Sequence, residues 1–166
     1  MKASVLTCVI LGAVATTAAA QSNSISVTAN VYQALTVSPG NDLAFGNVFP
    51  GVNKTISLGA AGAGRFDITG QTGATASLTL TLPNSGNYIL GPSSAQLPLG
   101  SWTACWNVSN SGGAGCTSFD PNAGANAAFG AGTTLFVFLG ATTSPSASQA
   151  AGNYTGTATL TVAYVN

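Results

Sequence analysis

Histidine and glutamate are absent from this chain of 166 residues, and its formal charge comes entirely from three Lys or Arg residues and three Asp residues. Enzymes mostly use His, Glu and Asp as general acids and bases. An enzyme would therefore need Asp42, Asp67 and Asp120, which are widely separated in the sequence, to converge in one cleft. We expect instead a protein that is not an enzyme and that uses no cofactor and no metal ion.

Positive charge is equally scarce, because Lys2, Lys54 and Arg65 are the only cationic residues. Neutralising a row of nucleic-acid phosphates takes several Lys or Arg side chains, and so does electrostatic attachment to anionic lipid. We therefore expect neither nucleic acid nor a charged membrane surface as a partner.

A long hydrophobic run is also missing. The most apolar stretch, residues 5–14, is about half of the roughly 20 residues that a membrane-spanning helix needs. It follows Lys2 and precedes small residues that end at Ala20, which is the three-part pattern of a secretory signal peptide. We predict that residues 1–20 are removed by cleavage between Ala20 and Gln21. The mature protein is then expected in the periplasm, at the cell surface or outside the cell, without a membrane span.

Export changes how the cysteines are interpreted. Only Cys105 and Cys116 remain after the signal peptide, and thiols in an oxidising compartment tend to pair. A metal site or a redox pair is the alternative, but the spacing is not Cys-x-x-Cys and no His is present to complete a zinc site. We predict a disulfide that closes a loop rich in Gly, Ser and Asn, and that adds about 2 to 3 kcal/mol of stability on the chain-entropy estimate.

Apolar and polar residues alternate with period two along most of the mature chain, and no stripe with a helical period of 3.6 residues is convincing. Clusters of Gly, Pro, Asn and Ser separate the alternating runs, as turns do. We expect strands at residues 25–37, 43–51, 55–58, 65–69, 77–82, 88–90, 101–108, 135–139 and 154–165, with a turn at 38–41. The pattern predicts an all-β fold, a single antiparallel β-sandwich domain with Greek-key connections over residues 21–166.

Residues 135–139 differ from the other runs because they are apolar on both faces. A sandwich strand with one solvated face needs only one apolar face. Two interpretations are open. Either a loop covers the second face, or that face meets a partner chain, since contiguous exposed apolar surface usually marks an interaction site.

The first alternating run places Ile25, Val27, Ala29 and Val31 on one face of an extended segment. A sheet edge exposes unpaired N–H and C=O groups, and an extended segment can add to such an edge with its apolar side chains in a groove. Residues 21–32 are therefore a candidate donor strand for assembly with copies of the chain or with related subunits. The alternative is that they form the first strand of their own sandwich.

Two tryptophans offer a different function. Trp102 and Trp106 are four residues apart, so they share a face of a regular strand. Paired indoles can stack on sugar rings, which would make the protein a monomeric carbohydrate-binding module, whereas the simpler interpretation is packing beside the disulfide. Asp120, Asn122 and Asn126 offer oxygen atoms to calcium, but calcium sites usually have more than one carboxylate.

Two short segments carry a resemblance to a known family. They are residues 43–51, with the sequence LAFGNVFPG, and residues 149–157, with the sequence QAAGNYTGT. They resemble two segments, D-L-x-F-G-x-x-x-P-G-like and A-A-G-x-Y-x-G-T, of the secreted bacterial domain-of-unknown-function family 4402. That family is similar to spore-coat-U-like and chaperone-usher pilin domains. The resemblance implies an immunoglobulin-like, pilin-like sandwich at the cell surface or in a filament, with a periplasmic chaperone as a partner.

The end of the chain also looks like the terminal edge strand of usher-assembled pilins, in the spacing of Gly152, Leu160, Val162 and Tyr164. The cysteines depart from that pattern, because the disulfide of those pilins ties early strands and both cysteines here lie in the middle of the chain. We expect a secreted structural or adhesive protein of the cell envelope, a pilin-like subunit that assembles by β-strand addition. The carbohydrate-binding module is the alternative.

Overall fold

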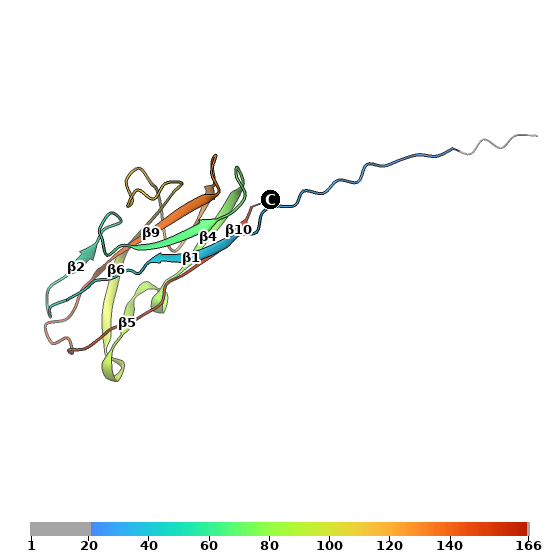
Figure 1. Cartoon of the computed structure of the whole chain (residues 1–166). Helices are drawn as coiled ribbons and strands as arrows, with labels where there is room; N and C mark the ends of the chain where they lie inside the picture. Colours follow the sequence, from blue (N-terminus) through green and yellow to red (C-terminus); the bar gives the residue numbers. More distant parts are fainter. Residues whose placement is uncertain (1–20, 166) are drawn as a thin grey trace, which may run out of the picture. The chain divides into compact units, whose positions relative to one another are not determined.

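The larger of two antiparallel sheets has seven strands in a computed structural model that describes residues 21–165 (Figure 1). The signal peptide predicted at residues 1–20, including Ala20 at its cleavage site, lies outside the described residues. The main path of this sheet is β1 (Thr36–Asn41), β3 (Gly64–Thr69), β9 (Thr134–Thr143), β6 (Gln96–Asn107) and β5 (Tyr88–Leu90). Two short strands join it, β2 (Lys54–Ile56) beside β9 and β7 (Thr117–Phe119) beside β6.

The smaller sheet has three strands, in the order β10 (Thr159–Tyr164), β4 (Thr75–Thr81) and β8 (Ala125–Ala128). All pairings in both sheets are antiparallel among the described residues. Two short 3-10 turns, Pro83–Gly86 and Pro92–Ser94, complete the regular structure. The predicted all-β antiparallel sandwich is confirmed.

The hydrophobic core between the sheets follows the alternation of the sequence. In β4, Leu78 and Leu80 are buried, whereas the intervening Thr79 and the following Thr81 are exposed. Successive side chains of a strand point to opposite faces, so the Leu side chains meet the other sheet and the Thr side chains meet water. Other buried members of the core are Ile68, Ala104, Phe129, Leu135, Val137, Leu139 and Leu160.

Strand β9 is buried on both faces because loops cover its outer side. Phe138 is opposite Cys105 of β6 and is 3% exposed. The chain at Ile56 and Leu58 passes so close to β9 that a Cβ atom on Gly140 would touch both backbones. A covering loop therefore accounts for the apolar run at residues 135–139, and a partner chain is not required to bury it.

The beginning of the fold differs from the sequence-based prediction. No strand is assigned in residues 21–35, and β1 begins at Thr36. The turn expected at residues 38–41 is instead the second half of β1, where Pro39 pairs with Phe66 of β3. Pro is compatible with this position because β1 is an edge strand, so its missing N–H breaks no central ladder. The register shifts between Pro39 and Asn41, within the residues whose composition predicts a turn.

The strand expected at residues 43–51 is also wrong. Two of these residues bond other segments through their N–H groups, Ala44 to the carbonyl of Gly62 at 2.9 Å and Gly51 to the carbonyl of Ser146 at 3.0 Å, but no strand is assigned among them. Gly46 and Gly51 have φ angles of 61° and 73°. These left-handed conformations, which glycine adopts readily, interrupt an extended run. Residues 42–53 form an irregular segment instead.

Candidate functional site

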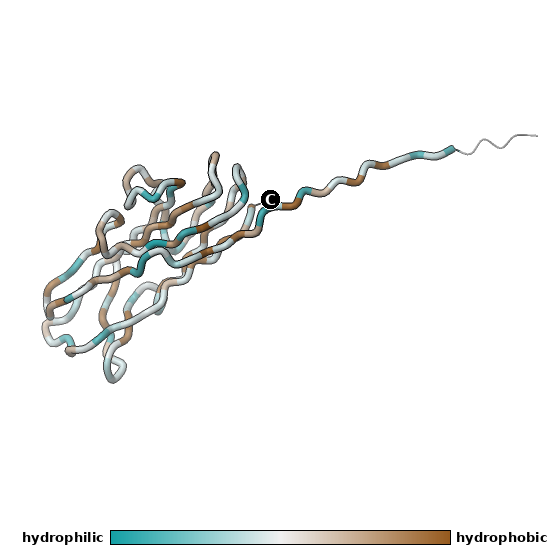
Figure 2. Tube along the Cα trace, in the orientation of Figure 1, coloured by the Kyte–Doolittle hydropathy of each residue, from teal (hydrophilic) through white to brown (hydrophobic). Residues whose placement is uncertain are grey.

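Residues 21–31 carry an exposed apolar face. Ile25, Val27 and Val31 are 88%, 89% and 94% exposed, and Ala29 between them is exposed as well. Figure 2 shows hydrophobic and hydrophilic residues alternating along this segment. Isolated exposed apolar side chains are common on proteins, but a regular apolar face is typical of an interaction site.

The chain becomes anchored at the next two residues. The ring of Tyr32 lies 5.1 Å from the ring of Tyr164 on β10. The Tyr164 hydroxyl donates a hydrogen bond to the carbonyl of Gln33 at 2.7 Å and accepts one from the N–H of Gln71 at 2.7 Å. The N–H of Gln33 in turn donates to Oε1 of Gln71 at 3.3 Å. From Tyr32 onward the chain is therefore held by β10 and by the segment that follows β3.

The two edge strands β1 and β10 leave inward-pointing side chains partly uncovered. Val37 of β1 pairs with Ile68 of β3, and directly paired residues point to the same face of a sheet. Ile68 is fully buried, whereas Val37 is 39% exposed. In β10, Val162 pairs with the buried Leu78 but is itself only half-buried. The core is thus open along the edges of the two sheets.

A groove of about 1110 Å³ is lined by two runs of ten consecutive residues, 41–50 and 149–158. Apolar side chains of the larger sheet and its connections also line it, including Phe66, Leu97 and Trp102. Leu97 is buried, while Phe66 and Trp102 are half-buried, so apolar surface is accessible in the groove. We call this feature the acceptor groove.

Backbone groups along both sides of the acceptor groove lack partners. Thr155 exchanges both backbone hydrogen bonds with Leu90, so Tyr154 and Gly156 direct theirs to the opposite edge. In the described part of the chain, no backbone group bonds to those of Tyr154 or Gly156. Unpaired N–H and C=O groups at an edge are a template for an additional strand.

The other side repeats this arrangement. Ala44 bonds toward Gly62, on the edge that β1 shares with β3. Leu43 and Phe45 flank it and direct their backbone groups to the free edge, and they bond to no other backbone group among residues 21–165. Both sides of the groove can therefore accept hydrogen bonds from, and donate them to, an extended chain.

The two segments that carry the family resemblance, residues 43–51 and 149–157, form most of the two sides of the acceptor groove. Residues 35–164 match the family described as Domain of unknown function (DUF4402). The chain belongs to the DUF4402 family. No curated protein matches its sequence. In this DUF4402 domain, the two segments that resemble the family thus line one surface feature.

Three of the four residues predicted for the terminal strand lie on β10. Leu160 is buried against the core, and Val162 and Tyr164 are half-buried at the sheet edge. Gly152 is not part of the strand, which begins at Thr159. Its φ angle of 148° and the contact that a Cβ atom would make with Pro92 explain why a glycine occupies this position.

The tryptophans of this DUF4402 domain pack against its core. Trp102 and Trp106 are both half-buried against the central hydrophobic cluster. The indole N–H of Trp102 donates to the carbonyl of Gly86 at 2.7 Å. The packing interpretation therefore fits the geometry better than a sugar-binding platform, which needs exposed indole faces.

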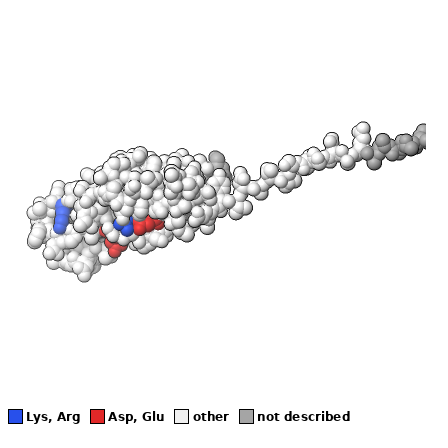
Figure 3. Space-filling model, turned by 45° about the horizontal axis from the view of Figure 1, so that its top comes forward, with Lys and Arg blue, Asp and Glu red and all other residues white. Residues whose placement is uncertain are grey.

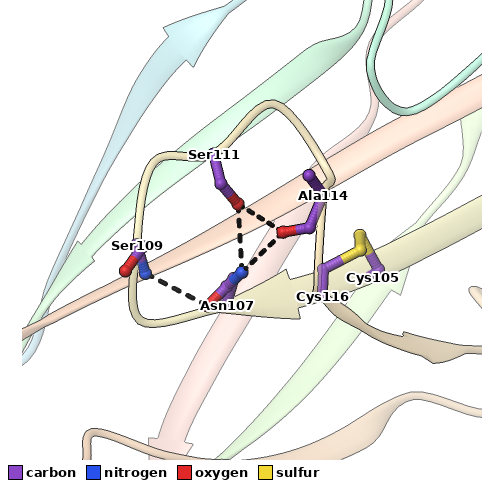
Figure 4. The surroundings of a disulfide bond; sticks show 6 residues. All are labelled: Cys105, Asn107, Ser109, Ser111, Ala114 and Cys116. Carbon is purple, nitrogen blue, oxygen red and sulfur yellow. Dashed lines mark hydrogen bonds between the residues drawn. A yellow bond between two sulfur atoms is a disulfide. The ribbon is translucent and has the colours of Figure 1, made fainter.

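The predicted disulfide is present between Cys105 and Cys116 (Figure 4). The loop that it closes is organised by Asn107, whose side chain donates to the Ser111 hydroxyl and to the Ala114 carbonyl, each at 3.1 Å. These bonds pair polar groups within the loop. The bridge has a structural role at the end of β6.

Two of the three aspartates have a local hydrogen-bonding partner among the described residues. Asp67 pairs with Arg65 at 2.6 Å, and Asp120 accepts the N–H of Asn122 at 2.9 Å within its own turn. Within residues 21–165, no group of three or more His, Cys, Asp or Glu side chains is placed to hold a metal ion. Most of the surface in Figure 3 is uncharged. The same residues include no helix with the length and hydropathy of a membrane span.

Sequence reasoning did not identify the acceptor groove. Phe45, Phe49 and Phe66 line it, and Phe49 is 67% exposed. The two aromatic residues within the first family segment were a signal, since an unpaired run with repeated Phe and several turn residues is unusual on a solvated surface. The local sequence predicts a strand at residues 43–51 instead.

Proposed function

We propose that this protein is an exported, non-enzymatic structural subunit of the bacterial envelope, which joins neighbouring subunits by adding residues 22–31 to their sheets. One observation carries the proposal: Ile25, Val27 and Val31 form a regular apolar face that is almost fully exposed. Burying such side chains in a partner is favourable by about 1.5 to 3 kcal/mol for each Val or Ile. Export rests on the predicted signal peptide.

The scarcity of charge supports the same proposal. Residues 21–166 contain two cations and three aspartates, and residues 22–32 contain no charged residue at all. Net charge keeps protein molecules apart and soluble. A nearly uncharged chain meets little repulsion when its copies approach one another, which suits a protein that functions in an assembly.

Carbohydrate binding by a monomer is the less well supported function. It depends on Trp102 and Trp106 presenting free indole faces, and both pack against the core. An adhesive role of the assembled protein needs a ligand site of its own, and the described residues suggest no candidate for it.

Assembly is tested by light scattering on the mature chain, Gln21 to Asn166. A variant beginning at Tyr32 retains all residues of the hydrophobic core and lacks the exposed apolar face. We expect the mature chain to form species much larger than a monomer and the shortened chain to remain monomeric and folded. A mature chain that is monomeric at high concentration contradicts the proposal.

Point variants of the full chain test whether assembly needs the apolar face of the segment and not only its length. Val27→Asp places a charge on the apolar face, whereas Thr28→Asp places the same charge on the polar face of the segment. We expect Val27→Asp to abolish assembly and Thr28→Asp to retain it. Equal effects of the two substitutions would mean that general charge, and not strand addition, controls the association.

A further inference from the structure

We propose that the acceptor groove, between residues 41–50 and 149–158, receives residues 22–31 of a second copy of this chain. The inference rests on the proposed function and adds the site at which the strand is received. The occupant inserts Ile25, Val27, Ala29 and Val31 toward the core and bonds through its backbone to the sides of the groove.

The dimensions of the groove fit an extended chain. Ten consecutive residues line each side, and the volume is about 1110 Å³, whereas pockets for small molecules have about 300–1,000 Å³. A strand rises about 3.3 Å per residue, so Ile25 to Val31 spans roughly 20 Å. An elongated groove of this size takes several side chains of a strand in a row.

The chemistry of the groove fits this particular segment. Its lining includes the apolar side chains of Phe45, Phe66 and Leu139, which would meet the four apolar residues of the segment. The alternate residues of the segment, Ser26, Thr28 and Asn30, are polar and would face water. The segment has no charge to bury next to the core.

The backbones of the two sides are ready to pair. Tyr154 and Gly156 on one side, and Leu43 and Phe45 on the other, direct unpaired N–H and C=O groups away from their existing neighbours. A strand between them would be paired on both of its edges. Beyond residue 158, the edge strand β10 of the three-stranded sheet also has a free side.

Two features favour a second copy over the chain's own segment. Reaching its own groove would require the segment to fold back before β1, and because residues 21–38 contain no Gly or Pro, such a turn would depend on Asn or Ser residues. Tyr32 and Gln33, where such a reversal would lie, are bound to Tyr164 and Gln71. The segment of another copy enters without this reversal.

The test mixes two full-length variants that are defective in different halves of the contact. Val27→Asp damages the segment and leaves the groove intact, while Phe45→Asp damages the groove and leaves the segment intact. Phe49→Asp is a second groove variant at an exposed position, which keeps the test valid if Phe45→Asp does not fold. Val52→Asp is the matched control, because Val52 is 56% exposed and does not line the groove.

We expect Val27→Asp and Phe45→Asp each to be monomeric in light scattering, and Val52→Asp to assemble like the unaltered chain. Mixed in equal amounts, the two defective variants should form a complex of twice the monomer mass and nothing larger. The intact segment of one chain then occupies the intact groove of the other, and no further chain can be added. Phe49→Asp should weaken association at least tenfold.

The outcomes distinguish this inference from the proposed function. If Val27→Asp prevents assembly while both groove variants assemble like Val52→Asp, strand addition stands and the acceptor groove is the wrong site. If the unaltered chain is monomeric, both proposals fail. If the mixture of Val27→Asp and folded Phe45→Asp remains monomeric, the pairing of segment with groove is wrong.

Discussion

The hydroxyl of Tyr164 donates a 2.7 Å hydrogen bond to the carbonyl of Gln33, across 131 positions of the sequence. It links the last strand of the smaller sheet to Gln33, one of the two anchored residues that follow the exposed segment 21–31. The same hydroxyl accepts the N–H of Gln71, so one oxygen atom joins three parts of the chain.

Tyr164→Phe removes that oxygen and retains the ring. The carbonyl of Gln33 and the N–H of Gln71 then lose a partner, which should lower the free energy of unfolding by about 1–3 kcal/mol. Urea unfolding measures the loss, and faster amide exchange at residues 32–35 should accompany it. Tyr88→Phe is the control, since the described residues provide no hydrogen-bond partner for the Tyr88 hydroxyl, and a similar loss there would contradict the assignment.

Phe129 is the largest of the fully buried side chains. Phe129→Ala should reduce the free energy of unfolding by about 3–5 kcal/mol, because it removes buried apolar surface and leaves a cavity. Phe49→Ala removes the same atoms from an exposed position and should change stability by no more than about 0.5 kcal/mol. Both variants are made in the chain that begins at Tyr32, which we expect to be monomeric, so chemical unfolding compares their stabilities without a contribution from assembly. Comparable losses for both variants would show that the core is wrongly placed.

The Cys105–Cys116 bridge closes a loop with a sequence separation of 11. Replacing both cysteines with Ala should cost about 3 kcal/mol, because the unfolded chain regains the freedom of that loop. Reduction of the unaltered protein should produce a similar loss, measured by thermal unfolding. The double variant should not respond to reductant, and a response would reveal an effect unrelated to the bridge.

Asp120 acts in a turn, with its Oδ1 atom 2.9 Å from the N–H of Asn122. Asp120→Asn keeps a carbonyl oxygen in that position and should be nearly neutral. Asp120→Ala loses the hydrogen bond and should cost about 1 kcal/mol. Calcium or a chelator should shift the unfolding temperature of none of the three proteins. A rise with calcium that depends on Asp120 would restore the metal-site interpretation.

Several features followed from local sequence alone. The alternation of Leu78, Thr79 and Leu80 predicts a strand with one buried face. This prediction does not depend on the strand's position in the sheet, because period two is a property of the extended backbone. The disulfide followed from composition, since Cys105 and Cys116 are the only cysteines outside the predicted signal peptide. The family match over residues 35–164 agrees with the resemblance that two short segments carried.

Other features depended on contacts that no local pattern records. Ser38 to Asn41 has the composition of a turn, yet pairing with β3 holds it in a strand. Residues 43–51 have the apolar content of a short strand, yet positive φ angles at Gly46 and Gly51 interrupt it. Local propensity is overridden when a neighbouring strand supplies hydrogen bonds or when the chain has to turn.

The sequence by itself determined the all-β class, the bridge between Cys105 and Cys116, and the apolar face of residues 25–31, because each depends on residues close together in the chain or on their total number. The acceptor groove was decided only by the tertiary structure. Its sides, residues 41–50 and 149–158, are separated by about a hundred positions. Folding places one beside the residues that precede β3 and the other beside β5 of the larger sheet, and only there do their unpaired backbone groups and apolar side chains form one surface.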